Sequence, residues 1–357
     1  MISHYGENLK LSIFGASHAP EIGMELEGIP VGLPVNLEAL QRFMDRRAPG
    51  QHLWSTARKE SDVPHFQGGL TDGRTNGQSI RAVILNENIR QGDYAALKHI
   101  PRPGHADFTA WMKYGLDFDM SGGGPFSGRM TAPLCIAGGL CKQWLEQRGI
   151  RTGAHISAIG TVIDDAFDPL SPDLDGVQKD FPVLNPACGQ QMQAAIEEAK
   201  KQGDSLGGII ECAVTGLPAG LGGPMFEGIE GKIAHMIYGI PAVKGVEFGL
   251  GFALTTYPGS KANDAYAVKD GRIHPTSNHC GGVLGGISTG MPIIFRVALK
   301  PTPSISKPQA SVNMDTMEEV SMEINGRHDP CIVPRAVPVV EAAAAIAIYD
   351  LILGESI

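Results

Sequence analysis

Length, composition and charge narrow the class of protein before any motif is considered. The chain has 357 residues, of which 43% are hydrophobic and 19% charged, and its formal charge is −9. These values are typical of a globular protein large enough to bury a sizeable core. The negative charge argues against non-specific nucleic-acid binding, so the arginines must act locally. We therefore expect no nucleic-acid partner, and a single domain spanning residues 1–357.

Two further features indicate the cellular compartment. The N-terminus lacks the basic stretch and apolar core of a signal peptide, and no apolar run reaches the roughly 18 residues of a membrane span. We therefore predict a cytoplasmic protein with no membrane partner. The cysteines are scattered without a CxxC pair, which favours reduced thiols over disulfides or a metal site. They are Cys135, Cys141, Cys188, Cys212, Cys280 and Cys331.

The first predicted elements are short strands followed by a helix. Residues 11–14 are an apolar strand, and residues 24–27 alternate between apolar and charged side chains, as in a strand with one buried face. Asn36 can cap a helix that ends before Gly50. This helix carries an apolar stripe that predicts one buried side. The stripe consists of Leu37, Leu40, Phe43 and Met44.

Two long apolar segments, residues 131–149 and 337–353, are predicted to be buried helices. Between them, residues 291–297 alternate as a strand does. Helices that are apolar nearly all round need cover on several sides. A helical layer between antiparallel sheets, which is an α+β fold, satisfies both patterns better than a doubly wound parallel sheet does.

The chain also carries signs of an internal duplication. Residues 68–80 match residues 281–293 at a constant offset of 213, and a second pair of segments matches at a different offset, 188. Glycine-rich turns can also look alike by chance in a chain with 46 glycines. We favour the duplication and predict two related halves, at about 1–150 and 190–357, each with one of the long apolar helices.

Three loop segments contain imidazoles beside glycine or proline. His18 follows a predicted strand, where a lone histidine is usually structural. His105 lies between Arg102 and Asp107, in a segment where proline fixes the backbone and glycine leaves room for a ligand. Asp329 belongs to the third segment, for which an ion-paired turn is the alternative. Imidazoles beside arginines and carboxylates indicate a site that handles an anion.

Further candidates for anion binding lie at the ends of the predicted helices. The loop 121–129 contains three successive glycines, whose backbone amides together with Arg129 could cradle phosphate oxygens. Arg335 lies near the start of the last helix, where unpaired N–H groups also favour an anion. Arg46 and Arg47 end the first helix, with an exposed charged face as the alternative. The sequence has neither a P-loop nor a GxGxxG motif, which disfavours an ATPase or a standard dinucleotide site.

Together these segments resemble the chorismate synthase family, from about residue 11 to residue 353. The most specific parts are residues 102–107 (RPGHAD), 277–288 (SNHCGGVLGGIS), 300–302 (KPT) and 326–331 (GRHDPC). The resemblance implies a β-α-β sandwich, a homotetramer, and the anti-1,4-elimination of phosphate from 5-enolpyruvylshikimate-3-phosphate to give chorismate. It also implies reduced FMN as a required cofactor that lends electron density and is restored.

The resemblance further implies roles for individual residues. His18 would protonate the departing phosphate, His105 would stabilise the anionic reduced flavin, and Asp329 would assist proton removal near the flavin N5. Arginines would bind the phosphate and the two carboxylates of the substrate. These arginines are Arg46, Arg47, Arg102, Arg129 and Arg335. The positions expected to bind FMN are Arg47, Ser127, Ala242, Gly285, Lys300, Pro301, Thr302, Pro303, Ser304 and Arg327, and no metal is implied.

Several positions depart from the commoner family pattern. The usual FGESHG is FGASHA in this chain, and Pro125 and Phe126 replace an arginine and a serine of the usual RSSAR. Leu53 stands where an arginine is often found, and Pro241 stands where an asparagine usually precedes AVKG. These changes concern the expected FMN and NADPH contacts more than the three catalytic residues.

The sequence leaves two alternatives to the FMN-dependent lyase. A flavin-dependent reductase on the same scaffold would consume NADPH stoichiometrically and release no phosphate. An inactive homologue would bind anions without turnover, as the altered residues after the triple glycine suggest. The sequence also leaves open whether NADPH reduces the flavin on this chain or an external flavin reductase supplies the electrons.

Overall fold

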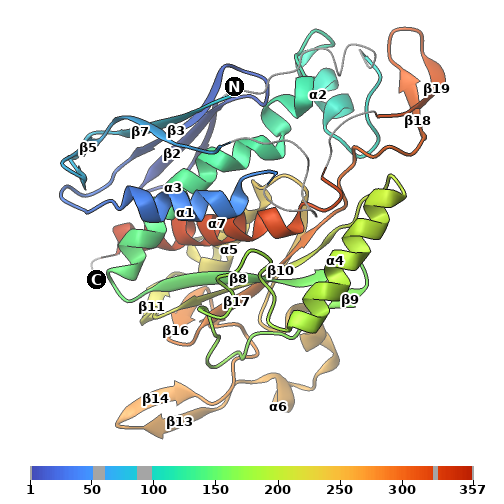
Figure 1. The fold of residues 1–357 in the computed structure, drawn as a ribbon. Helices are drawn as coiled ribbons and strands as arrows, with labels where there is room; N and C mark the ends of the chain where they lie inside the picture. The colour runs from blue at the N-terminus through green and yellow to red at the C-terminus, as the bar shows by residue number, and fades with distance from the viewer. Residues whose placement is uncertain (1, 51–60, 87–98, 325–328, 356–357) are drawn as a thin grey trace.

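Two large antiparallel sheets and a layer of helices make up the protein (Figure 1). The computed structural model describes residues 2–50, 61–86, 99–324 and 329–355. The first sheet has the strand order β1-β2-β3-β7-β4, and each neighbouring pair is antiparallel. Its strands are β1 (Ile2–Tyr5), β2 (Lys10–Gly15), β3 (Glu21–Glu27), β4 (His65–Gly68) and β7 (Ile80–Leu85).

The second large sheet has the order β12-β17-β10-β8-β9 and is also antiparallel throughout. Its strands are β8 (Arg151–Ile159), β9 (Val162–Ile163), β10 (Gly208–Thr215), β12 (Val243–Phe248) and β17 (Ile293–Leu299). A three-stranded sheet contains β11 (Ala219–Gly222), β15 (Val283–Leu284) and β16 (Ile287–Thr289). Three hairpins pair β5 (Leu70–Thr71) with β6 (Arg74–Thr75), β13 (Tyr266–Lys269) with β14 (Arg272–Pro275), and β18 (Gln309–Asn313) with β19 (Glu318–Met322).

Helices α1 (Leu37–Arg47), α3 (Thr131–Glu146) and α7 (Val333–Gly354) lie between the two large sheets (Figure 1). Helix α3 packs against α7 and against β3 of the first sheet, while α7 packs against β8 and β10 of the second. The prediction of a mixed α+β fold with antiparallel sheets is therefore confirmed. The other helices are α2 (Asp107–Tyr114), α4 (Pro186–Lys201), α5 (Ile229–Tyr238), which contacts α7, and α6 (Gly259–Ala262).

Helix α7 forms the centre of the hydrophobic core. Its residues 342–348 are fully buried, and it meets α3 so closely that a Cβ on Gly138 would lie 2.3 Å from the Cβ of Ala342. The helix is long and apolar enough to span a membrane, but 89% of its most apolar 18-residue stretch is buried inside the protein. Helix α7 is therefore a core helix, as the all-round apolar pattern indicates.

The other local predictions are confirmed with one exception. Asn36 caps α1, because its side-chain oxygen accepts a hydrogen bond from the backbone N–H of Ala39 at 2.9 Å. Leu40 is buried with the two other core-facing residues of the stripe, but Leu37 is 51% exposed, so the predicted stripe was wrong at that position. The reason is that residues 36–38, the start of α1, face solvent. All six cysteines are free thiols.

Four strands of each large sheet pair in a corresponding order, β2-β3-β7-β4 in the first and β8-β10-β17-β12 in the second. Strands β5, β6 and β7 begin at residues 70, 74 and 80, and β15, β16 and β17 begin 213 residues later in each case. In the first sheet, β3 precedes α1 and pairs with β7 across a glycine-rich turn region; in the second, β10 precedes α5 and pairs with β17. The glycine-rich turns thus precede β7 of the first sheet and β17 of the second.

A buried ionic group fastens the loop after β9 to the second sheet. His155 of β8 is fully buried, with Nε2 3.0 Å from Oε2 of Glu211 and Nδ1 3.3 Å from Oδ2 of Asp164. Burial lowers the pKa of His155, but its hydrogen bonds to the two carboxylates outweigh burial and raise the pKa above its usual value. The carboxylates also accept hydrogen bonds from the backbone N–H groups of Leu184 and Phe167. The two carboxylates therefore favour the protonated form of His155.

Candidate active site

The triple-glycine loop before α3 brings two of the predicted catalytic histidines together. Gly122, Gly123 and Gly124 have φ angles of +59°, +95° and +52°, which glycine adopts more readily than other residues. A Cβ on Gly122 would lie 2.0 Å from Cε1 of His18, and a Cβ on Gly123 would lie 3.2 Å from Nε2 of His105. The absence of side chains on this loop therefore lets both imidazoles pack against successive residues.

The turn that carries His18 is held from two sides. The backbone N–H of Ser17 donates a hydrogen bond to the carbonyl oxygen of Gly124 at 3.1 Å. The side chain of Asn86, just after β7, donates to the carbonyl oxygen of Ala19 at 2.7 Å. These bonds fix the turn after β2 relative to the glycine loop and to the end of the neighbouring strand.

His105 is oriented by a buried carboxylate. Oδ1 of Asp107 lies 2.7 Å from Nδ1 of His105, and the same carboxylate accepts hydrogen bonds from Nε and Nη2 of Arg102, each at 2.7 Å. Burial raises the pKa of Asp107, but these hydrogen bonds outweigh burial and hold the pKa well below its usual range. An ionised carboxylate can only accept, so Nδ1 of His105 carries the hydrogen. Nε2 is consequently the nitrogen that faces Gly123.

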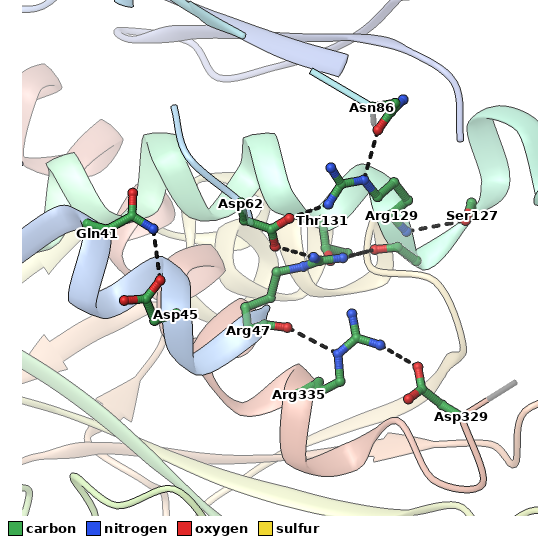
Figure 2. A network of polar contacts seen from close by, with 11 residues as sticks. Gln41, Asp45, Arg47, Asp62, Asn86, Ser127, Arg129, Thr131, Asp329 and Arg335 are labelled. Atoms are coloured by element: carbon green, nitrogen blue, oxygen red, sulfur yellow. Dashed lines mark hydrogen bonds and ion pairs between the residues drawn. The ribbon is translucent and has the colours of Figure 1, made fainter. Parts of the chain in front are cut away.

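A second buried carboxylate joins two of the predicted substrate-binding arginines (Figure 2). Oδ2 of Asp62 lies 2.5 Å from Nη1 of Arg47, and Oδ1 of Asp62 accepts a hydrogen bond from Nη1 of Arg129. Arg129 also donates from Nε to Oδ1 of Asn86 at 3.1 Å. Burial raises the pKa of Asp62, but the two guanidinium groups outweigh burial and lower the pKa. Asp62 is thus an ionised bridge between α1 and the segment before α3.

Arg335 and Asp329 extend this cluster at the start of α7. Nη1 of Arg335 pairs with Oδ2 of Asp329, and Nε of Arg335 donates to the backbone carbonyl oxygen of Arg47 at 3.1 Å. Burial has the largest effect on the pKa of Arg335 and lowers it, and the positive charge of Arg47 lowers it further. The structure therefore brings Arg47, Arg129, Arg335 and Asp329 into one connected group (Figure 2).

Arg46 lies outside this cluster, although it is next to Arg47 in α1. Its guanidinium makes two hydrogen bonds, at 3.0 and 2.7 Å, to Glu341, a fully buried residue of α7. Burial lowers the pKa of Arg46, but the Glu341 carboxylate outweighs burial and raises it. Lys142 of α3 lies 3.3 Å from the same carboxylate. Successive helical residues point about 100° apart, so Arg46 ties α1 to α7 while Arg47 reaches the cluster.

The segment expected to bind FMN lies against the loop of His105. Nζ of Lys300 donates to the carbonyl oxygen of Gly104, and a Cβ on Gly104 would lie 3.5 Å from Cβ of Pro303. The backbone N–H of Lys300 donates to the carbonyl oxygen of Ala242 at 3.0 Å. Within the described part of the chain, the buried hydroxyl of Thr302 has no hydrogen-bond partner. The structure thus brings the segment 300–304 and Ala242 to the edge of the histidine loop.

A cavity of about 390 Å³ adjoins the glycine loop. Two positions that depart from the family pattern, Pro125 and Pro241, line this same cavity, together with Gly15 at the end of β2. The neighbouring residues Ser127 and Ala242 are both expected to bind FMN. Pro125 and Pro241 therefore lie close together in the fold, although they are far apart in the sequence.

One sequence-predicted position, Gly285, does not join this group of contacts. Gly285 lies in the turn between β15 and β16, with a φ of +62° and open space where a Cβ would project. Arg327 and Leu53 lie outside the described residues. Among the residues that the structure describes, no group of three histidine, cysteine or acidic side chains could hold a metal ion.

Sequence reasoning missed Asp62 and Asn86 and did not assign a separate role to Asp107. Asp62 is 15 residues from Arg47 and 67 from Arg129 in the chain, so no local pattern reveals the bridge. Of these three residues, only Asp107 could have been identified from the sequence, because it lies in the same short segment as Arg102 and His105.

Buried arginines paired with carboxylates, close to two imidazoles, are typical of an enzyme site that handles an anion. A family model described as chorismate synthase matches residues 9–353. The chorismate synthase of Lancefieldella parvula is 46% identical, covering 98% of this chain and 96% of the relative, and that of Thermococcus kodakarensis is 44% identical, covering 98% and 97%. A solved structure titled "Crystal Structure of Chorismate Synthase" aligns with a TM-score of 0.78 and 27% identity, covering 98% of this chain and 93% of that one. This chain belongs to the chorismate synthase family and is a phosphate-eliminating lyase of the shikimate pathway.

Proposed function

We propose that the chain eliminates phosphate from 5-enolpyruvylshikimate-3-phosphate in an anti-1,4 sense to give chorismate, and that it binds reduced FMN for this purpose. The observation that carries the proposal is the packing of His18 and His105 against successive glycines of one loop. Reduced FMN, when bound, supplies electron density to the substrate.

The proposed FMN site consists of residues at the edge of the His105 loop. Lys300 and Ala242 are joined by a backbone hydrogen bond, and the buried hydroxyl of Thr302 suits a polar ligand because it has no partner within the described part of the chain. We propose the same role for Ser127, Gly285, Pro301, Pro303, Ser304 and Arg327.

The proposed substrate contacts are the guanidinium groups of Arg47, Arg129 and Arg335. A guanidinium matches phosphate and carboxylate geometry through paired N–H donors. Arg102 and Arg46 take other roles in this proposal because they lie outside the connected group of Arg47, Arg129 and Arg335. Arg102 is bonded to Asp107 and Arg46 to Glu341. Arg102 therefore supports His105, and Arg46 supports the placement of α1.

The proposed catalytic groups act at stated atoms. His18 donates a proton to the departing phosphate. His105, whose Nδ1 hydrogen is held by Asp107, presents Nε2 to the loop and stabilises negative charge there when this nitrogen is also protonated. Asp329 accepts or relays the proton removed from the substrate, and its ion pair with Arg335 keeps its carboxylate in place.

The decisive experiment is anaerobic phosphate release from 5-enolpyruvylshikimate-3-phosphate, with dithionite-reduced FMN and a control lacking flavin. Flavin-dependent release with chorismate formed supports the proposal. Substrate binding without release would instead favour the inactive anion-binding homologue suggested by Pro125 and Phe126. Stoichiometric NADPH oxidation without phosphate release would favour a flavin-dependent reductase.

We also propose a cytoplasmic homotetramer. Large exposed apolar side chains support self-association, because a contiguous apolar patch on a protein surface is typical of an interaction site. They include Met225, Phe226, Phe252, Val268 and Ile273, each more than two-thirds exposed. Light scattering after gel filtration tests the tetramer, and monomer mass at micromolar concentration would contradict it.

The source of the electrons for FMN can be tested by replacing dithionite with NADPH in the assay. Activity with NADPH alone would show that the chain reduces its own flavin, and a continued requirement for dithionite would favour an external flavin reductase.

We further propose that the two halves arose by duplication within the single domain. The equal offset between β5, β6 and β7 and β15, β16 and β17 supports this, as does the corresponding order β2-β3-β7-β4 and β8-β10-β17-β12 in the two large sheets. Superposing the two sheets with their following helices tests it. A Cα deviation no smaller than that between unrelated antiparallel sheets would contradict the duplication.

A further inference from the structure

A single buried carboxylate lies between two of the proposed substrate-binding arginines. We infer that Asp62 is a positioning residue that sets the places of the Arg47 and Arg129 guanidinium groups so that both can engage the anionic substrate. This inference rests on the proposed function, because it requires that these two arginines bind the substrate.

The geometry of Asp62 suits this role. Each carboxylate oxygen engages a different guanidinium, Oδ2 that of Arg47 and Oδ1 that of Arg129. Arg47 comes from the end of α1, while Arg129 comes from the short helix before α3, so the carboxylate joins two separate elements (Figure 2). Each arginine also donates to a neutral oxygen, Arg47 to Thr131 at 3.1 Å and Arg129 to Asn86 at 3.1 Å.

Because these three side chains are buried, their arrangement depends on the negative charge of Asp62. Asp62 is fully buried, and Arg47 and Arg129 are 3% and 6% exposed. Two guanidinium groups so poorly solvated repel each other strongly unless a negative charge lies between them. Asp62 supplies this negative charge to both guanidinium groups, and so it keeps Arg47 and Arg129 together.

Two substitutions separate the charge of Asp62 from its position. Asp62→Asn keeps the shape but removes the charge and places an NH₂ group against a guanidinium. Asp62→Glu keeps the charge but moves it by one methylene. In both cases we expect the KM for 5-enolpyruvylshikimate-3-phosphate to rise about tenfold, which corresponds to about 1.4 kcal/mol of binding. The kcat should change by less than about threefold, because the lost contacts act on bound substrate and transition state alike.

Glu341→Gln is the matched control. Glu341 is as deeply buried as Asp62, and it pairs with Arg46, the residue beside Arg47 on the same helix, but it lies outside the cluster. We expect it to lower the melting temperature of the full chain as Asp62→Asn does, while leaving KM within about twofold of the wild-type value. A merely structural role of Asp62 would make the two variants alike in KM.

The assays use the full-length chain with dithionite-reduced FMN under anaerobic conditions. A raised KM in a folded Asp62 variant, absent from Glu341→Gln, supports the inference. An unchanged KM in the Asp62 variants, an equal rise in Glu341→Gln, or failure of both Asp62 variants to fold overturns it. Arg129→Lys separates this outcome from a failure of the proposed function. If Arg129→Lys also leaves KM unchanged, the proposed substrate contacts are wrong; if it raises KM while the Asp62 variants do not, only the positioning inference fails.

Discussion

Replacing Asp107 by asparagine tests the orientation of His105 without removing the imidazole. The Asp107 carboxylate accepts four hydrogen bonds, from Nδ1 of His105 at 2.7 Å and from the backbone N, Nε and Nη2 of Arg102 at 3.0, 2.7 and 2.7 Å. An asparagine has one acceptor oxygen and an NH₂ group. The amide therefore has to present a donor either to His105 or to Arg102, and it removes the negative charge from both.

Two separate losses follow from Asp107→Asn. A wrongly oriented or wrongly protonated His105 should lower kcat by about 100-fold, the lower end of the usual contribution of a positioned acid or base. The buried Arg102, which is 6% exposed, loses its ion-pair partner, and breaking such a pair costs about 3–5 kcal/mol of unfolding free energy. Because domains have a stability of roughly 5–15 kcal/mol, the variant should remain folded at low temperature.

Phosphate release, measured at low temperature, and thermal unfolding, each with the same reduced FMN, check the two losses separately. Asp175→Asn is the control, because it breaks the solvent-exposed ion pair with Arg151 and should leave kcat and melting temperature unchanged. If Asp107→Asn unfolds at a lower temperature but keeps kcat within twofold, the carboxylate stabilises the loop without orienting a catalytic group, and the reasoning is refuted.

Three further predictions follow from other contacts. Gly122→Ala places a Cβ 2.0 Å from His18 and should lower kcat about 100-fold in the phosphate-release assay. Gly138→Ala crowds the Cβ of Ala342 at 2.3 Å and should reduce the unfolding free energy in urea by about 1–3 kcal/mol. His155 has a raised pKa in the folded state, so its contribution to stability is fully present below the unfolded pKa of about 6.5 and is lost as pH rises through the folded value. Denaturant unfolding from about pH 6.5 upward should therefore show a decline in stability that His155→Gln lacks.

Each of these three predictions has its own control and its own contrary result. A Cβ on Gly231, in α5, meets open space, so Gly231→Ala should be neutral or slightly stabilising. An equal loss of kcat or of unfolding free energy in this variant would show that the effects at Gly122 and Gly138 are not specific to those sites. Unchanged turnover in Gly122→Ala would mean that His18 tolerates displacement, and unchanged stability in Gly138→Ala would mean that α3 and α7 can separate freely. A pH dependence that is the same in His155→Gln and the wild type would assign the decline to other groups.

The helices and strands were largely predictable because local periodicity reports local burial. The two apolar segments, residues 131–149 and 337–353, lie largely in α3 and α7, and the alternating residues 24–27 lie in β3. The prediction for Leu37 was wrong because periodicity specifies a face of the helix and not how far along the helix the cover extends. Only the packed neighbours decide that the start of α1 is exposed.

The candidate site was predictable as a set of segments and not as a set of contacts. The motif at residues 102–107 contains its own ion pair and so could be read locally, and the glycine loop could be expected to approach a ligand. Asp62 could not be found in this way, because its partners Arg47 and Arg129 come from other elements. Arg46 pairs with Glu341 and Arg47 with Asp62. These pairings likewise depend on which elements pack against α1.

The sequence by itself determined the class of fold, the family and the loops that carry the chemistry, because apolar periodicity, glycine positions and short motifs are local properties of the chain. Only the tertiary structure decided that His18 and His105 meet on one glycine loop, that Asp62 joins two arginines, and that Arg46 turns towards Glu341. The physical reason is that a buried charge needs a partner within hydrogen-bond distance, and packing between elements far apart in the chain selects that partner.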